Sequence, residues 1–129
     1  MILTFIVLSK TYSIYRFKKD SILPDWIYSS DFYSITQTKD ELSVIAVQTN
    51  LILDDTLISK DWRIFQIVGP LDFSLIGIIA DISKIFKDKQ ISIFTISTYE
   101  TDYILIKQKD LNLGADALRK KEHKITIEN

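Results

Sequence analysis

Short apolar runs separated by polar turns make up most of this chain. Eight of these runs predict β-strands, because they are rich in β-branched and aromatic residues: 2–8, 12–17, 32–37, 42–48, 62–68, 91–97, 102–107 and 124–128. Residues 44–47 form a continuous apolar stretch, which is typical of a strand covered on both faces. Residues 49–61 have the weakest pattern, and we expect a loop with a helical turn there.

Helical periodicity is clearest after Pro70. Six apolar residues follow one face of a helix with a period of 3.6 residues: Leu75, Ile78, Ile79, Ile82, Ile85 and Phe86. Asp72 or Ser74 is placed to cap this helix, since a side-chain oxygen can accept from the amides of the first turn. A second helix is predicted around residues 111–118, and Pro24 is placed to open a short helix over 25–29.

The order of elements in the second half is β-α-β-β-α-β. This order predicts an α+β, ferredoxin-like (βαββαβ) domain over 62–129, with two helices on one face of a four-stranded antiparallel sheet. The first half, 1–61, has the strands but only vestigial helices, and it fits a degenerate copy of the same unit. Sequence identity between the halves is too low to demonstrate a repeat.

Composition narrows the function classes. With 16 basic and 17 acidic residues the chain has no overall basic excess, so we expect no nucleic-acid partner. Cysteine is absent, which excludes disulfides and thiolate chemistry. The apolar run 1–8 is too short to cross a bilayer and lacks the basic region of a signal peptide, so we expect no membrane association and a cytoplasmic location.

Catalytic chemistry finds no support in the residue types. His123 is the only histidine, and its charged neighbours predict a solvent-exposed side chain. No nucleophile–base pair can be identified, so we predict that the chain is not an enzyme and has no cofactor. The adjacent Asp54 and Asp55 are interpreted as a solvated turn, and no metal site is predicted.

Polar residues do gather where a small ligand could bind. The loop from Gly69 to Ser74 leads into a helix N-terminus, whose amides can receive a carboxylate. Asp102 follows a polar hairpin tip and could pair with an ammonium group. Gly77 within a predicted helix indicates a close backbone approach. Each signal has a simpler interpretation, because the loop could be only a strand-to-helix connection and the tip only a polar hairpin.

Two stretches together resemble a known family. The run Gly69-Pro-Leu-Asp-Phe-Ser-Leu-Ile-Gly77 and the run Ile91-Ser-Ile-Phe-Thr-Ile-Ser-Thr-Tyr-Glu-Thr-Asp-Tyr-Ile-Leu-Ile-Lys107 resemble a bacterial family of small tandem ACT-domain proteins. Residues 32–44 and Asp61-Trp-Arg63 fit it too, so that the resemblance covers most of 12–122. A more distant similarity is to the ACT domains of CASTOR-type cytosolic arginine sensors. The resemblance implies two tandem ACT-like halves with the first reduced: 1–61 as a degenerate half and 62–129 as an ACT domain.

The family also implies a function and a site. ACT modules regulate by binding a small effector, commonly an amino acid, and often pair, so the resemblance implies an effector partner and a homodimer. Carried over here, the ligand-binding residues are Asp72, Phe73, Ser74, Gly77, Thr95, Ile96, Ser97, Thr98 and Asp102. The expected function is a non-catalytic regulatory or sensor protein. The alternative is a structural or oligomerisation module that has no ligand.

Overall fold

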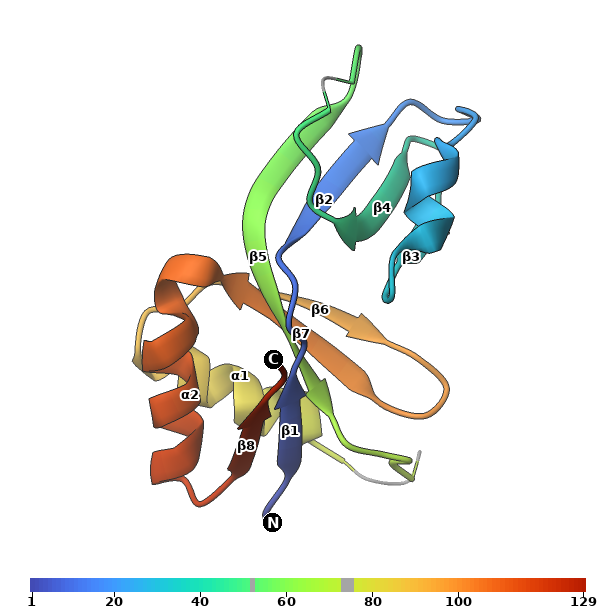
Figure 1. Cartoon of the computed structure of the whole chain (residues 1–129). Coiled ribbons are helices and arrows are strands. Elements are labelled where there is room, and N and C mark those ends of the chain that lie inside the picture. Colours follow the sequence, from blue (N-terminus) through green and yellow to red (C-terminus); the bar gives the residue numbers. More distant parts are fainter. Residues whose placement is uncertain (52, 73–75) are drawn as a thin grey trace. The chain divides into compact units, whose positions relative to one another are not determined.

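The chain forms two compact units (Figure 1). The computed structural model describes residues 1–51, 53–72 and 76–129. Unit 1 consists of Met1–Ser9 and Arg63–Asn129, and unit 2 consists of Lys10–Trp62. The break after Trp62 lies beside the boundary expected at 61/62, whereas the first nine residues pack with the second part of the chain. The division into an ACT-like half, 1–61, and an ACT domain, 62–129, stays a prediction.

Unit 2 has the strand order of a ferredoxin-like fold. Its elements are β2 (Tyr12–Phe17), the 3₁₀ helix η1 (Asp25–Ser29), β3 (Ser34–Gln37), β4 (Leu42–Val47) and the first part of β5 (Leu57–Ile67). The strands pair in the order β3-β4-β2-β5, and each described pair is antiparallel. One turn of 3₁₀ helix stands where the first helix would be, and no helix is described between β4 and β5. The predicted reduced, ACT-like first half is therefore confirmed.

Burial explains why so short a unit keeps its sheet. Ile27 of η1 is fully buried and packs in one cluster with Tyr15, Val44 and other residues of β2 and β4. Val44, Ile45 and Ala46 are all buried, as expected for a strand covered on both faces. The predicted loop over 49–61 was wrong from Leu57 onward, because these polar and exposed residues form β5 by pairing with β2.

Unit 1 contains both long helices. Its elements are β1 (Thr4–Val7), the last part of β5, α1 (Ile78–Asp88), β6 (Ile93–Ser97), β7 (Asp102–Lys107), the 3₁₀ helix η2 (Gln108–Asp110), α2 (Leu111–Lys120) and β8 (Lys124–Ile127). Ile78, Ile82 and Phe86 bury one face of α1 against the core. The core also includes Phe65 of β5 and Leu118 of α2. The mixed α+β architecture predicted from the sequence is confirmed.

One strand departs from the predicted four-stranded sheet. The order in unit 1 is β8-β1-β5-β7-β6, so β1 lies between β8 and β5. β1 is antiparallel to β5 and parallel to β8. β1 therefore occupies the place beside β5 that β8 would fill in a βαββαβ sheet. Phe5 and Val7 of β1 are fully buried, and they make this strand part of the core.

The loop that follows β5 is attached to the β6–β7 hairpin. Thr101 is 6% exposed, and its hydroxyl donates to the carbonyl of Ile67 at 2.6 Å. The amide of Leu71 donates to the carbonyl of Glu100, also at 2.6 Å. Gly69 lies so close that a Cβ there would meet the Glu100 carbonyl oxygen at 2.9 Å and the Thr101 Cβ at 3.1 Å. The loop and the hairpin are therefore held together by one side-chain and one main-chain hydrogen bond, and their close approach leaves no room for a side chain at Gly69.

Histidine 123 is not the exposed side chain that the sequence predicted. Its Nδ1 accepts from the amide of Leu3 at 3.0 Å, and its ring meets the ring of Phe5 edge-on with centroids 5.8 Å apart. The pairing of β8 with β1 draws His123 against β1, since the amide of Lys124 donates to the carbonyl of Leu3. Burial lowers the pKa of His123 below its ordinary value.

The substitution Gly69→Ala is expected to lower the free energy of unfolding by roughly 1–3 kcal/mol, because the backbone of Glu100 must move to admit a methyl group. Urea unfolding followed by circular dichroism measures this. Ser92→Ala, at an exposed position, serves as the control and should change stability by less than about 0.5 kcal/mol. Equal stability of the two variants would show that the loop and hairpin tolerate separation.

Acidification should destabilise the chain through His123. Its pKa is lower in the folded state, so the unfolded state binds the proton first as pH falls below about 6.5. The contribution of His123 is complete above that pH and is lost as pH falls toward the folded-state pKa. Urea unfolding between pH 8 and pH 5 should therefore show a steeper loss of stability for the native chain than for His123→Gln, which keeps an acceptor without titrating. Parallel curves would contradict this assignment.

Candidate functional site

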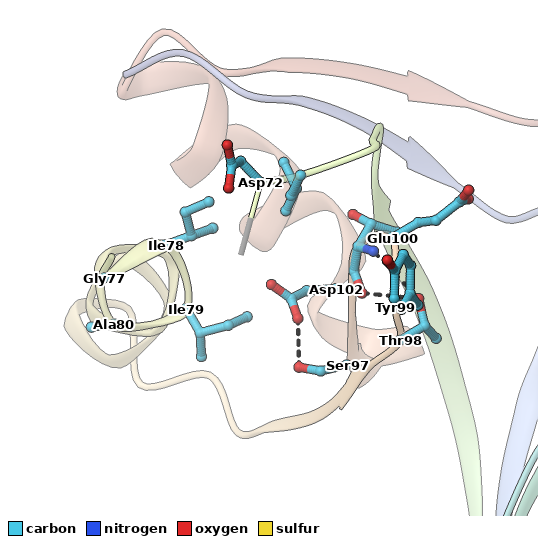
Figure 2. Close-up of a pocket in the computed structure, with 12 residues that line it drawn as sticks. Asp72, Gly77, Ile78, Ile79, Ala80, Ser97, Thr98, Tyr99, Glu100 and Asp102 are labelled. Carbon is cyan, nitrogen blue, oxygen red and sulfur yellow. Dashed lines mark hydrogen bonds between the residues drawn. The ribbon is translucent and has the colours of Figure 1, made fainter. Parts of the chain in front are cut away.

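A cavity of about 440 Å³ lies between the N-terminal turn of α1 and the β6–β7 hairpin (Figure 2). This volume falls in the range of small-molecule sites, roughly 300–1,000 Å³. The described residues that line it all belong to unit 1: Leu71, Asp72, Gly77, Ile78, Ile79, Ala80, Ser97, Thr98, Tyr99, Glu100, Thr101 and Asp102. The loop after β5, the helix start and the hairpin tip each supply one wall.

Five of the nine residues predicted for the site line this cavity: Asp72, Gly77, Ser97, Thr98 and Asp102. Thr95 and Ile96 are not among its lining residues and lie farther along β6. Phe73 and Ser74 lie outside the described residues. Whether any of the nine contacts a ligand stays a prediction.

The first turn of α1 is the part of the cavity that the sequence interpretation missed. Leu75 fits the apolar periodicity, which placed the helix start too early, whereas α1 begins at Ile78. The turn of α1 that borders the cavity is therefore Ile78, Ile79 and Ala80. Gly77 was the available signal, because glycine is accepted at the position just before a helix.

Gly77, and not Asp72 or Ser74, is the N-cap residue of α1. Its φ is 83°, in the left-handed region that favours glycine, and no side-chain cap hydrogen bond is described at this helix end. A Cβ built on Gly77 would meet no described heavy atom within 4 Å, so the expectation of a close backbone approach was wrong. The glycine satisfies a dihedral requirement and leaves space above the first turn. Figure 2 shows the side chains of Ile78 and Ile79 directed from this turn toward Asp102.

Asp102 supplies the opposite charge. The Ser97 hydroxyl donates to Asp102 Oδ1 at 2.5 Å, and the two residues form the last described pair of the β6–β7 ladder. Figure 2 shows the Asp102 carboxylate directed across the cavity toward α1. Asp72 lies at the rim near Ile78, while the side chain of Glu100 points away from the cavity. The Asp102 carboxylate and the first turn of α1 thus border one small space.

Metal or catalytic chemistry finds no support in this arrangement. Among the described residues, no group of three His, Asp or Glu side chains gathers closely enough to hold a metal ion. The described lining contains no histidine or lysine that could serve as a base.

None of the described helices has the length and apolar character that crossing a bilayer requires.

Comparison with known proteins agrees with the fold. The family model described as ACT domain matches residues 57–120, and a second model, described as an N-terminal domain, matches residues 10–53. The two matches fall on either side of the loop that precedes β5. A comparison with curated proteins gave no match.

Solved structures share the architecture over most of the chain. A protein from Agobacterium tumefaciens is 29% identical and covers 100% of this chain and 96% of its own, with a TM-score of 0.89. The regulatory subunit of aspartate kinase from Thermus thermophilus is 12% identical and covers 87% of this chain and 93% of its own, with a TM-score of 0.61. Aspartate kinase from Synechocystis is 14% identical, with 99% of this chain and 28% of that chain covered and a TM-score of 0.69.

At these low identities the two aspartate kinase structures show a common fold and nothing more. The ACT-domain model matches the part of the chain that carries the cavity, because residues 57–120 include β5, α1, the β6–β7 hairpin and α2. Residues 57–120 therefore match the ACT-domain family.

Proposed function

We propose that this chain is a non-catalytic regulatory protein that binds a small amino-acid-like effector in the cavity of unit 1. The observation that carries the proposal is that the first turn of α1, where helix amides have no intrahelical acceptor, lines the same cavity as the Asp102 carboxylate. An α-amino acid carries the two matching charges on adjacent atoms. ACT domains are regulatory modules, which supports the same assignment.

Each charge of the effector has a defined counterpart. The α-carboxylate would accept from the amides of Ile78, Ile79 and Ala80, which a helix N-terminus presents for anions. The α-ammonium would donate to Asp102 in a charge-assisted hydrogen bond. Ser97 would orient the Asp102 carboxylate by donating to its Oδ1, which leaves the other Asp102 oxygen for the ligand. Thr98 would border the ligand at the hairpin tip.

A comparison within the chain supports a single site. The β3–β4 and β6–β7 hairpins have the same four-residue turn, which begins with Thr38 in unit 2 and Thr98 in unit 1. The amide of Thr38 donates to the carbonyl of Glu41 at 2.9 Å, and the amide of Thr98 donates to that of Thr101 at 2.8 Å. Each threonine hydroxyl also accepts from the amide of the fourth turn residue. The two hairpins are therefore equivalent positions of a structural repeat.

The equivalent place in unit 2 has lost the polar chemistry. Gln37 and Leu42 stand where unit 1 has Ser97 and Asp102. Leu42 is buried in the core of unit 2, and Gln37 Oε1 accepts from the amide of Asp20 at 3.1 Å. The amide of Asp20, in the loop after β2, thus occupies the side-chain acceptor of Gln37. One effector per chain is the stoichiometry that follows.

A structural or oligomerisation module is the alternative. Ile76, beside the lining residue Gly77, is 94% exposed, and Tyr99, which lines the cavity itself, is 81% exposed, so that a second protein surface could bind there instead. A homodimer and a cytoplasmic location remain predictions.

Thermal unfolding in the presence of each common amino acid at millimolar concentration tests the proposal. An effector at 100 times its dissociation constant should stabilise the native chain by about 2.7 kcal/mol. Asp102→Asn keeps an acceptor for Ser97 but removes the charge, and it should weaken binding by roughly 10- to 100-fold, the contribution of a hydrogen bond to a charged group. Asp116→Asn, on α2, is the control and should bind as the native chain does. The absence of any shift would favour the module without a ligand.

Isothermal titration with the amino acid that gives the largest shift should show one binding event per chain. The reason is that Gln37 and Leu42 replace the polar pair in unit 2. Removal of Asp102 should abolish that event without uncovering a second one. Two equal sites per chain would contradict the inference that the hairpin of unit 2 does not bind an effector.

A further inference from the structure

A second cavity of unit 1 lies between the last turns of α1 and α2, and we call it the helix-end groove. Its volume is about 320 Å³, and its described lining residues are Ile85, Asp88, Lys89, Ala117, Lys120 and Lys121. Gly114 of α2 lets the two helices come close, because a Cβ there would meet Phe86 Cε1 of α1 at 3.1 Å. None of the lining residues borders the cavity beside the β6–β7 hairpin, so the groove is a separate site.

Basic side chains are concentrated at this end of unit 1. Residues 84–89 and 116–124 carry seven basic and three acidic side chains, whereas the rest of the chain carries nine basic and fourteen acidic ones. Complementing the helix dipoles accounts for one basic residue at each helix end, and Lys87 and Arg119 already supply it. The nearly neutral total therefore conceals a local positive excess that the helix ends do not require.

The acidic residue of the groove is already compensated. Lys84 Nζ donates to Asp88 Oδ2 at 2.9 Å, and this hydrogen bond and the charges of nearby lysines lower the pKa of Asp88 below its ordinary value. Among the described residues, no ion pair or hydrogen bond involves the ammonium group of Lys89 or Lys120. Both side chains are exposed. Two ammonium groups at the rim are thus available for carboxylates from another molecule.

We infer that the helix-end groove docks an acidic segment of a partner protein. An apolar side chain of the segment would lie on the floor that Ile85 and Ala117 form, and its carboxylates would accept from Lys89 and Lys120. The positive rim provides the charge complementarity, and the apolar floor provides a contact that water cannot replace.

The size of the expected interactions favours a protein segment over a small anion. An exposed ion pair raises affinity by at most about fivefold, so two or three such pairs hold a small anion weakly. The amides at the two helix ends add no donors, because those of Lys89 and Lys121 donate to main-chain carbonyls. A protein segment adds the contact of its apolar side chain and excludes water from the ion pairs.

A nucleic acid fits the groove less well. Its phosphates would use the lysines, but no aromatic side chain among the described lining residues could stack with a base. A charged backbone would also leave Ile85 and Ala117 uncovered. The combination of an apolar floor and a basic rim therefore favours an acidic protein segment.

Fluorescence anisotropy with a labelled helical peptide tests the inference. The peptide consists of glutamate and leucine, with the leucines on one face, and two matched peptides carry glutamine for glutamate or alanine for leucine. At low salt the glutamate–leucine peptide should bind roughly tenfold more tightly than either matched peptide, since each lacks one of the two contacts. Its affinity should fall as salt is added.

Two charge-matched variants assign the binding to the groove. Lys89→Glu combined with Lys120→Glu should weaken binding of the glutamate–leucine peptide by roughly tenfold or more, because two attractions become repulsions. Lys19→Glu combined with Lys39→Glu makes the same change in net charge at exposed positions of unit 2, and it should bind as the native chain does. Circular dichroism verifies that both variants are folded. Equal weakening by the two variants would overturn the inference, because net charge alone would then explain binding.

The other outcomes name a different occupant or none. If the peptide does not bind the folded native chain at low salt, the inference is wrong. Tighter binding of a DNA oligonucleotide of equal charge would assign the groove to nucleic acid. Light scattering that shows self-association of the native chain but not of the Lys89→Glu, Lys120→Glu variant would assign it to a second copy. None of these outcomes depends on effector binding, so the inference can fail while the proposed function stands.

Discussion

The attachment of one loop to one hairpin determines whether the cavity exists. The buried hydroxyl of Thr101 and the amide of Leu71 join the end of β5 to the β6–β7 turn, and Gly69 permits the close approach. Without these contacts the loop that leads into α1 would be free to move away from the turn that carries Asp102. Asp102 and the first turn of α1 would then no longer stand at a fixed separation, and such preorganisation raises the affinity of a small polar site.

Most of the secondary structure could be predicted, because the hydrophobic pattern of each segment agrees with the way that segment packs in the folded chain. The bounds of β2 and β7 coincide with the predicted ones, since Tyr12–Phe17 and Asp102–Lys107 are β-rich runs with polar ends. The first part of β5 could not be predicted, because its exposed polar residues become a strand only by pairing with β2. The position of β1 in the sheet and the burial of His123 against it likewise depend on pairing between distant segments.

The same distinction holds for the site. Asp72, Ser97 and Asp102 could be identified because polar residues at the ends of strands and at a helix entrance are visible in the sequence. The amides of α1 could not, because a single apolar residue, Leu75, extended the helical pattern across Gly77. The repeat was hidden for another reason. The hairpins of the two units have the same hydrogen bonds but mostly different residues. The equivalence of Thr38 and Thr98 is therefore visible in the structure and not in the sequence identity between the units.

The place of β1 has a consequence for how the molecule assembles. Residues 10–62 form an insertion between β1 and the remainder of unit 1, so unit 2 is contiguous in the chain and can fold as soon as it leaves the ribosome. Unit 1 must wait until β8 has been synthesised, because β1 pairs with that strand across about 120 residues of sequence. A fragment that starts at Trp62 would lack this strand and leave β5 and β8 with unpaired edges. Completion of the sheet that carries the cavity is therefore tied to synthesis of β8.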